Sequence, residues 1–184
     1  MGAVEDRLAE LGLSVPDVAA PVASYVPAVR TGAYVYTSGQ LPMREGQLIT
    51  TGKVGDQVSP EEAAACAQQC ALNAIAAVKA EIGDLDAVRR VVKVVCFVSS
   101  EPGFTAQPQV ANGASDLLGK AFGDAGVHAR SAVGVPVLPL DAPVEVEVLM
   151  EVSTPLDHQP STPLDHQPST PLDHQPSTPL DPSV

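Results

Sequence analysis

Apolar residues recur at helical spacing in three stretches of the chain. Residues three or four positions apart predict a short amphipathic helix within 1–13. A second helix is predicted between Ser59, whose hydroxyl can cap free backbone N–H groups, and Gly83, which ends the pattern. The third predicted helix covers residues 108–122.

The remaining apolar stretches are rich in valine and tyrosine, which favours strands over helices. A β-hairpin is predicted over 25–41, with a glycine-containing turn, and a short strand follows at 47–51. Longer strands are predicted at 88–100, 129–138 and 144–152. This order of elements indicates an α+β domain in which one sheet is covered by two helices on one side.

The last predicted strand alternates between two kinds of side chain. One face carries Val144, Val146, Val148, Met150 and Val152, and the other carries Glu145, Glu147, Leu149 and Glu151. The apolar face is expected to meet the helices. The acidic face must be solvated or buried against another subunit, and the sequence leaves both alternatives open.

Small side chains dominate the predicted core. The buried stripe of the long helix is expected to contain Ala63, Cys66, Ala67, Cys70, Ala74, Ala77 and Val78, and that of the next helix Val110, Ala114, Leu117, Leu118 and Phe122. Small residues let a helix lie close to a sheet. Cys66 and Cys70 are interpreted as small core residues, with a redox pair as the alternative.

The final residues, 153–184, repeat the octapeptide STPLDHQP three times and end with STPLDPSV. Each copy has one large apolar residue, so no core can form and a disordered tail is predicted after a domain at 1–152. The tail histidines His158, His166 and His174 could hold a metal loosely, but a solvated tail is the preferred interpretation.

Charge and hydropathy limit the partners of the domain. The formal net charge is −12, and the four tail aspartates leave the domain at about −8, which suits a nucleic-acid backbone poorly. The start MGAVEDRLAEL lacks the features of a signal peptide, and no apolar run is long enough to span a membrane. A cytoplasmic protein without membrane or nucleic-acid partners is therefore expected.

Three stretches resemble one known family. YTSGQLP at 36–42, ALNAIAAVKAEIGDLDAVRRVVKVVCFVSS at 71–100 and HARSAVGVPVLPLDAPVEVEV at 128–148 are similar to the RidA/YjgF family, also called the L-PSP endoribonuclease family. The segments GKVG and NGASDLL point to a bacterial subgroup of it. The resemblance covers roughly residues 20 to 152.

The resemblance implies a chorismate-mutase-like α+β fold with one mixed sheet, assembled as a homotrimer with clefts between subunits. Archetypal members hydrolyse reactive enamines and imines, such as 2-aminoacrylate, to 2-keto acids and ammonia. They use no metal and no organic cofactor, so none is expected here.

By this resemblance, Arg130 matches the family arginine that grips the substrate carboxylate. A planar guanidinium suits this role because it can donate two parallel bonds to a carboxylate. The alternative is a structural ion pair between Arg130 and Glu145 or Glu147.

Other candidates follow from the same resemblance. Glu145 occupies the position of a family glutamate that could orient a water or accept its proton, and an interface ion pair is its alternative. Tyr25 matches a tyrosine that reaches into the cleft, or is a half-buried hairpin residue. Ser38 and Gly39 could bind ligand through their backbone, or Gly39 only serves the turn.

Asn112 and Ala132 complete the predicted site, and His128 is considered beside them. Asn112 resembles a cleft asparagine, although its spacing to Arg130 is one residue longer than in archetypal members. Ala132 stands where those members often have cysteine. The missing thiol puts activity in doubt, although alanine keeps the backbone carbonyl. His128 is a candidate general base, but the sequence places no nucleophile beside it.

The leading hypothesis is therefore an enamine/imine deaminase in which Arg130 and Glu145 are catalytic. A noncatalytic trimer that binds 2-keto acids or similar carboxylates is the alternative. A ribonuclease fits less well, because the domain is acidic and has few aromatic residues.

Overall fold

The computed structural model describes residues 2–18 and 24–153. The predicted domain boundary lies at the end of this part, and the repeats, with His158, His166 and His174, fall outside it. The elements follow in the order α1 (Ala3–Glu10), β1 (Ala28–Thr31), β2 (Tyr34–Thr37), β3 (Met43–Arg44), β4 (Gln47–Leu48), α2 (Pro60–Ile82), β5 (Val88–Ser99), α3 (Gln107–Phe122), β6 (Ala129–Val135) and β7 (Val144–Val152). Short 3-10 turns lie at Leu85–Ala87, Gly123–Gly126 and Pro139–Asp141.

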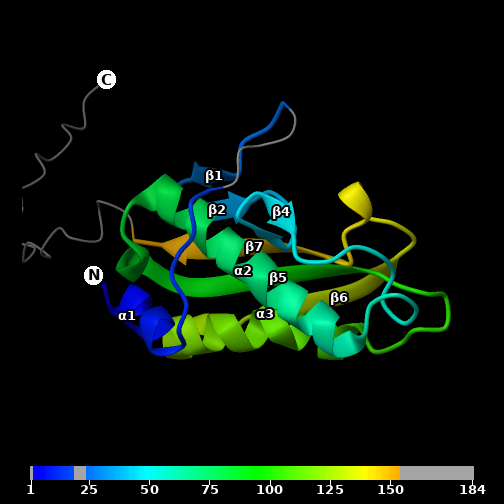
Figure 1. The fold of residues 1–184 in the computed structure, drawn as a ribbon. Helices are drawn as coiled ribbons and strands as arrows, with labels where there is room; N and C mark the ends of the chain where they lie inside the picture. Colours follow the sequence, from blue (N-terminus) through cyan, green and yellow to red (C-terminus); the bar gives the residue numbers. More distant parts are fainter. Residues whose placement is uncertain (1, 19–23, 154–184) are drawn as a thin grey trace, which may run out of the picture. The chain divides into compact units, whose positions relative to one another are not determined.

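Five strands form one mixed sheet in the order β1-β2-β7-β5-β6 (Figure 1). The pair β5 and β6 is parallel, because α3 carries the chain back across the sheet between them, and the other pairs are antiparallel. Strands β1 and β6 are therefore the two edges of the sheet, and neither pairs with a further strand on its outer side within residues 2–18 and 24–153.

Two helices cover one face of this sheet, as expected for the α+β fold. Figure 1 shows α2 and α3 side by side on that face, and α2 also contacts β7 while α3 contacts β5 and β6. The helices approach closely at Gly113, where a Cβ would overlap the carbonyl of Ala64. The additional helix α1 packs against α3.

The small-residue core is confirmed. All residues predicted for the two helical stripes are buried, and all three cysteines are free and buried. Burial raises the pKa of the Cys66 thiol to about 11 and that of Cys96 to about 12. Cys66 and Cys70 are therefore core residues rather than a redox pair.

Several element boundaries differ from the sequence prediction, among them those of two strands. The segment predicted as a strand at 47–51 forms only β4, which pairs with β3 in a separate two-stranded hairpin outside the main sheet. The strand predicted at 129–138 ends at Val135. Pro136 and Pro139 explain the earlier end, because proline cannot donate to a strand ladder.

The second face of the sheet has no covering layer within the described part of the chain. Strand β7 alternates between buried and half-buried residues, as predicted, and its acidic side chains lie on this open face. Beside them, the β2 tyrosines Tyr34 and Tyr36 are 41% and 48% exposed, and Val133 on β6 is 44% exposed. This face combines apolar and acidic side chains, so a second copy of the chain could bury it.

Candidate functional site

Arg130 lies on the edge strand β6, with its side chain on the helix-covered face. It is in register with Val94, which is part of the buried core. Its Nη1 donates to Asn112 Oδ1 at 2.9 Å and to Ser115 Oγ at 3.0 Å, and its Nη2 donates to the carbonyl of Pro108 at 3.1 Å. Three groups of α3 thus hold one end of the guanidinium in place.

The arrangement of α3 explains this contact. Asn112 and Ser115 are three residues apart and share one face of the helix, directly opposite β6. A guanidinium has five N–H donors. Arg130 uses two of them from Nη1 and one from Nη2 in hydrogen bonds to described residues. Its Nε–H and a second Nη2–H have no partner there, which leaves donors for an anionic ligand.

Glu145 lies on the opposite face of the sheet. It pairs with Phe97 on β5, next to the core-facing pair of Val146 and Cys96, so its side chain points to the face without helices. The side chain is half-buried, and burial, with a smaller contribution from Glu147, raises the pKa of its carboxyl. No residue in the described ranges makes a hydrogen bond or ion pair with this carboxyl.

Gly39 lies directly against Glu145. A Cβ at position 39 would overlap the Glu145 carboxylate, so only glycine allows this approach. The backbone of neighbouring Gln40 pairs with Val146 on β7, which fixes the segment beside the glutamate. Gly39 therefore does more than serve a turn.

Ser38 fixes the segment that precedes β1. Its hydroxyl donates to the carbonyl of Val26 at 2.7 Å, and its N–H donates to the carbonyl of Pro27 at 2.9 Å. Tyr25, next to Val26, is 47% exposed at this edge of the sheet. The tyrosine is thus available to a ligand or to a neighbouring chain.

The predicted residues fall into two groups within the chain. The arginine group contains Arg130, Asn112 and Ala132, with Ser115 added by the structure, at the β6 edge. The glutamate group contains Glu145, Gly39, Ser38 and Tyr25, near β1, β2 and β7. Since Arg130 and Glu145 face opposite sides of the sheet, the alternative ion pair between Arg130 and Glu145 or Glu147 is not formed in the described residues.

Sequence reasoning missed Ser115. Its Oγ lies 2.9 Å from His128 Nε2, although the sequence places no partner beside that histidine. The available signal was the spacing of Ser115 from Asn112, which puts both side chains on one face of the third predicted helix. Ala132 is half-buried, is in register with Cys96 and packs against the core.

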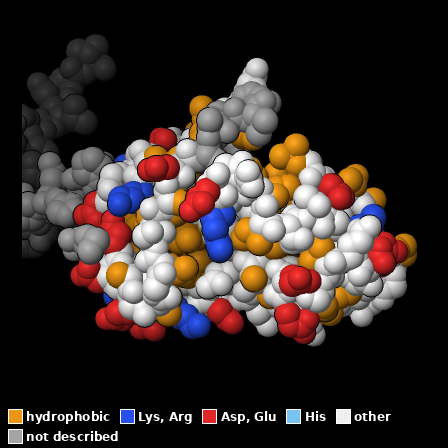
Figure 2. Space-filling model, viewed as in Figure 1, with side chains coloured by type: hydrophobic (Ala, Val, Ile, Leu, Met, Phe, Trp, Pro, Cys, Tyr) orange, Lys and Arg blue, Asp and Glu red, His pale blue; other side chains and the backbone are white. Residues whose placement is uncertain are grey.

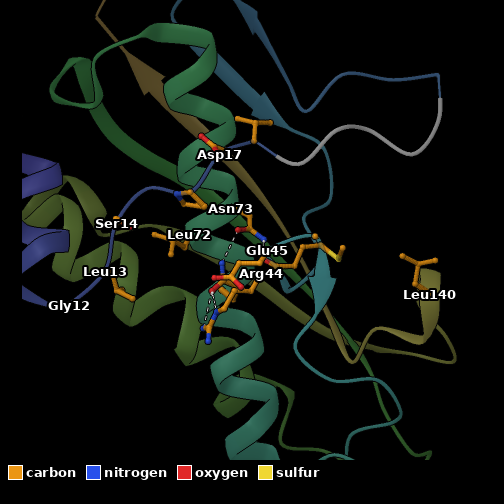
Figure 3. A pocket seen from close by; sticks show the side chains of 14 residues that line it. Gly12, Leu13, Ser14, Asp17, Arg44, Glu45, Leu72, Asn73 and Leu140 are labelled. Atoms are coloured by element: carbon orange, nitrogen blue, oxygen red, sulfur yellow. Dashed lines mark hydrogen bonds between the residues drawn. The ribbon is translucent and has the colours of Figure 1, made fainter.

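Two of the hollows in the described part of the chain lie near these elements. One, of about 440 Å³, is lined by Lys53, Ser100, Phe104, Gln107 and Gly134, among others, and lies at the far ends of β6 and α3 from His128. The larger, of about 930 Å³, lies between residues 12–18, the β3–β4 hairpin and α2 (Figure 3). It contains none of the predicted site residues.

Hydrogen bonds in the larger hollow have a structural role. Arg44 donates to Gln69 Oε1 at 3.1 Å, and Gln69 donates to Asn73 Oδ1 at 2.9 Å (Figure 3). Asn73 in turn donates to the carbonyls of Leu41 and Met43. This chain of bonds satisfies two buried amides and fastens the β3–β4 hairpin to α2.

Within the described residues, no group of three or more His, Cys, Asp or Glu side chains is placed to hold a metal ion. None of the described helices has the length and apolar character required to cross a membrane.

Comparison with known proteins agrees with the motifs and the fold. A family model described as "YjgF/chorismate mutase-like, putative endoribonuclease" matches residues 5–152. The chain belongs to the YjgF family. The match includes every residue of the arginine and glutamate groups.

Individual relatives share most of this length. Protein TCP17 of Trypanosoma cruzi is 46% identical, with 83% of this chain and 96% of the relative aligned. A 2-iminobutanoate/2-iminopropanoate deaminase of Dermatophagoides farinae is 32% identical over 77% of this chain and 95% of its own length. The crystal structure of an Agrobacterium tumefaciens protein of unknown function is 44% identical, with a TM-score of 0.76 over 82% of this chain and 92% of its own.

Proposed function

We propose that this YjgF-family protein hydrolyses 2-imino acids and their enamine tautomers to 2-keto acids and ammonia. The observation that carries the proposal is the guanidinium of Arg130, which α3 holds by three hydrogen bonds while Nε–H and one Nη2–H keep no partner among the described residues. A guanidinium that is held in place and keeps two N–H donors without a described partner is suited to binding a small carboxylate. The similarity to an iminobutanoate/iminopropanoate deaminase supports the same class of substrate.

The chemistry requires one water and one proton acceptor. Arg130 holds the carboxylate, so the adjacent imine carbon is presented in one orientation. Water adds to the carbon of the protonated imine, and Glu145 accepts a proton from that water, which gives a carbinolamine. Glu145 returns this proton to the nitrogen, the C–N bond breaks to release ammonia, and the hydroxyl proton passes to solvent as the keto group forms.

A complete cleft would use two chains. Arg130 lies on the β6 edge and Tyr25 next to the β1 edge, at opposite ends of the five-stranded order, and Arg130 and Glu145 face opposite sides of the sheet. A head-to-tail ring of subunits brings the arginine group of one chain to the glutamate group of the next. A homotrimer of this kind would also cover the open sheet face and its exposed tyrosines.

A noncatalytic carboxylate-binding protein is the second candidate. Ala132 favours it, because archetypal members often carry a thiol at this position and alanine supplies none. Under this alternative, Arg130 binds 2-keto acids in the same cleft and no hydrolysis follows.

A ribonuclease is not proposed, although the family description includes that activity. Figure 2 shows acidic side chains spread over the face in view, with basic side chains only as separate patches between them. A protein that tracks a phosphate backbone requires a continuous basic surface. The described residues in this view offer none.

The test generates 2-imino acids with an L-amino-acid oxidase and traps them with semicarbazide. Wild-type protein should suppress trapping. In Arg130→Ala the rate of imine hydrolysis should fall at least about 100-fold, because the carboxylate loses its bidentate donor. Arg90→Ala is the matched control, since Arg90 is an exposed arginine on β5 opposite Glu151. If wild-type protein leaves trapping unchanged for every amino acid while pyruvate binds in calorimetry, the noncatalytic alternative replaces the deaminase.

A further inference from the structure

His128 is connected to Arg130 through Ser115. The histidine lies half-buried in the turn between residues 123–126 and β6. Its Nδ1 is 2.6 Å from the carbonyl oxygen of Gly126, and its Nε2 is 2.9 Å from Ser115 Oγ. The same hydroxyl oxygen accepts a hydrogen bond from Arg130 Nη1 at 3.0 Å.

These partners assign the protons of the chain of bonds. A carbonyl oxygen can only accept, so Nδ1 of His128 carries the hydrogen and Nε2 of the neutral ring is an acceptor. The Ser115 hydroxyl therefore donates to Nε2, and its lone pairs turn towards Arg130. Every donor in this chain of bonds therefore meets an acceptor, and the Gly126 carbonyl fixes the direction of the bonds.

We propose that His128 is a positioning residue that sets the orientation of the Arg130 guanidinium through Ser115. The proposal rests on the proposed role of Arg130 in carboxylate binding and goes beyond it by naming what controls that role. With neutral His128, the Ser115 lone pair is held in the direction of Nη1. The free Nε–H and Nη2–H of Arg130 are then held where a carboxylate can accept both.

Other charged groups near this turn do not interrupt the chain of bonds. Helix α3 carries Asp116 and Lys120, the 3-10 turn carries Asp124, and β5 carries Lys93. Lys93 donates to Ser131 Oγ at 2.8 Å on the other side of β6. None of these four is hydrogen-bonded or ion-paired to His128 in the part of the chain that the structure describes.

The first test needs no substrate. Nitrogen-15 spectra of the histidine rings in the full-length protein should show His128 as the Nδ1–H tautomer at neutral pH, with a bare Nε2. The Arg130 Nε–H signal should show a rigid side chain in wild type and a mobile one in His128→Ala. An Nε2–H tautomer, or an equally rigid Arg130 in the variant, would overturn the proposal.

The second test separates positioning from catalysis. His128→Ala and Ser115→Ala should each raise KM for imino acids and the Kd for pyruvate about three- to tenfold, the effect of one lost hydrogen bond, with kcat little changed. His128→Gln should restore most of the affinity, because its amide oxygen can accept from Ser115. Ser131→Ala, which deletes a hydroxyl on the other face of the same strand, is the control and should bind pyruvate as wild type does.

The outcomes distinguish this proposal from the proposed function. If wild-type protein neither turns over imines nor binds pyruvate, the deaminase and the carboxylate site fail, whereas the tautomer and the Arg130 mobility still test the chain of bonds. A large loss of kcat with unchanged KM in Ser115→Ala would instead make Ser115 a catalytic residue and would overturn the positioning role.

Discussion

The guanidinium of Arg130 and the carboxyl of Glu145 lie on opposite faces of one sheet and differ in the number of their partners. Arg130 donates three hydrogen bonds to α3. Glu145 is half-buried against Gly39 and has no hydrogen-bond partner among the described residues, and its pKa is raised. The fold thus holds the Arg130 guanidinium in place by contacts, whereas it raises the pKa of the Glu145 carboxyl.

This difference suits two roles, carboxylate binding and proton transfer. A group that binds a carboxylate gains from being fixed before the ligand arrives, because less order is lost on binding. A group that accepts and returns a proton gains from a pKa nearer to neutral pH, which burial without a partner provides. The arginine group is therefore suited to binding and the glutamate group to proton transfer.

Replacement of Glu145 by glutamine should produce the largest effect on the chemical step. Glu145→Gln keeps the size of the side chain but cannot accept a proton, so kcat should fall about 10²- to 10⁴-fold while pyruvate binding remains. Steady-state kinetics with calorimetry on the same samples checks this. Equal losses of kcat and pyruvate affinity would show that the two groups do not divide the work in this way.

The second prediction concerns the shape of the cation. Arg130→Lys keeps the charge and loses the planar fork and the bonds to α3, so kcat/KM should fall about tenfold or more. Pyruvate titration should show the loss mainly as weaker binding. A lysine variant with wild-type affinity would mean that charge alone suffices and that the contacts of Arg130 with α3 have no role in binding.

A smaller effect is expected at Gly39. Gly39→Ala adds a Cβ that overlaps the Glu145 carboxylate, so the flexible glutamate must move away. The rate constant kcat should fall several-fold, about as much as one misplaced hydrogen-bonding group costs, with pyruvate affinity unchanged. Gly103→Ala is the control, because a Cβ at that position meets open space. An unchanged kcat in Gly39→Ala would mean that the placement of Glu145 beside Gly39 does not matter for the reaction.

The smallest effect concerns pH. If Glu145 accepts a proton, activity is present above its pKa and is lost as pH falls through it. The negative charge of Glu147 contributes to the raised pKa of Glu145, so Glu147→Gln should move this acid limb to lower pH. A pH–rate profile measures the shift, with Glu151→Gln on the same strand as control, and a limb that moves to higher pH would contradict the assignment.

Much of the fold could be predicted because its signals are local. The alternation of β7 and the Ser59–Gly83 helix depend on side-chain periodicity and capping, and both are confirmed. The strand predicted at 47–51 does not join the main sheet. The sequence could not show this, because a two-residue strand is too short to have a periodic pattern. Its attachment to α2 depends on Gln69 and Asn73, two polar residues on an otherwise small, apolar helix face.

The candidate site could be predicted only in part. The family motifs indicated Arg130 and Glu145, but the face of the sheet that each side chain occupies depends on the register of β6 and β7 with β5. The link from His128 through Ser115 to Arg130 joins a turn, a helix and a strand. The spacing of Ser115 from Asn112 places both side chains on one helix face, but the contact with His128 and Arg130 arises only when α3 packs across the sheet.

The most direct test of a shared cleft mixes two inactive variants. Arg130→Ala and Glu145→Gln chains, differently tagged and co-expressed, should form mixed trimers in which some clefts combine an intact Arg130 from one chain with an intact Glu145 from the next. For random head-to-tail assembly, about a quarter of the clefts are complete, so about a quarter of wild-type imine hydrolysis should return. If the mixed trimers form and remain as inactive as the single variants, Arg130 and Glu145 do not act together across a subunit boundary and the proposed division of work is wrong.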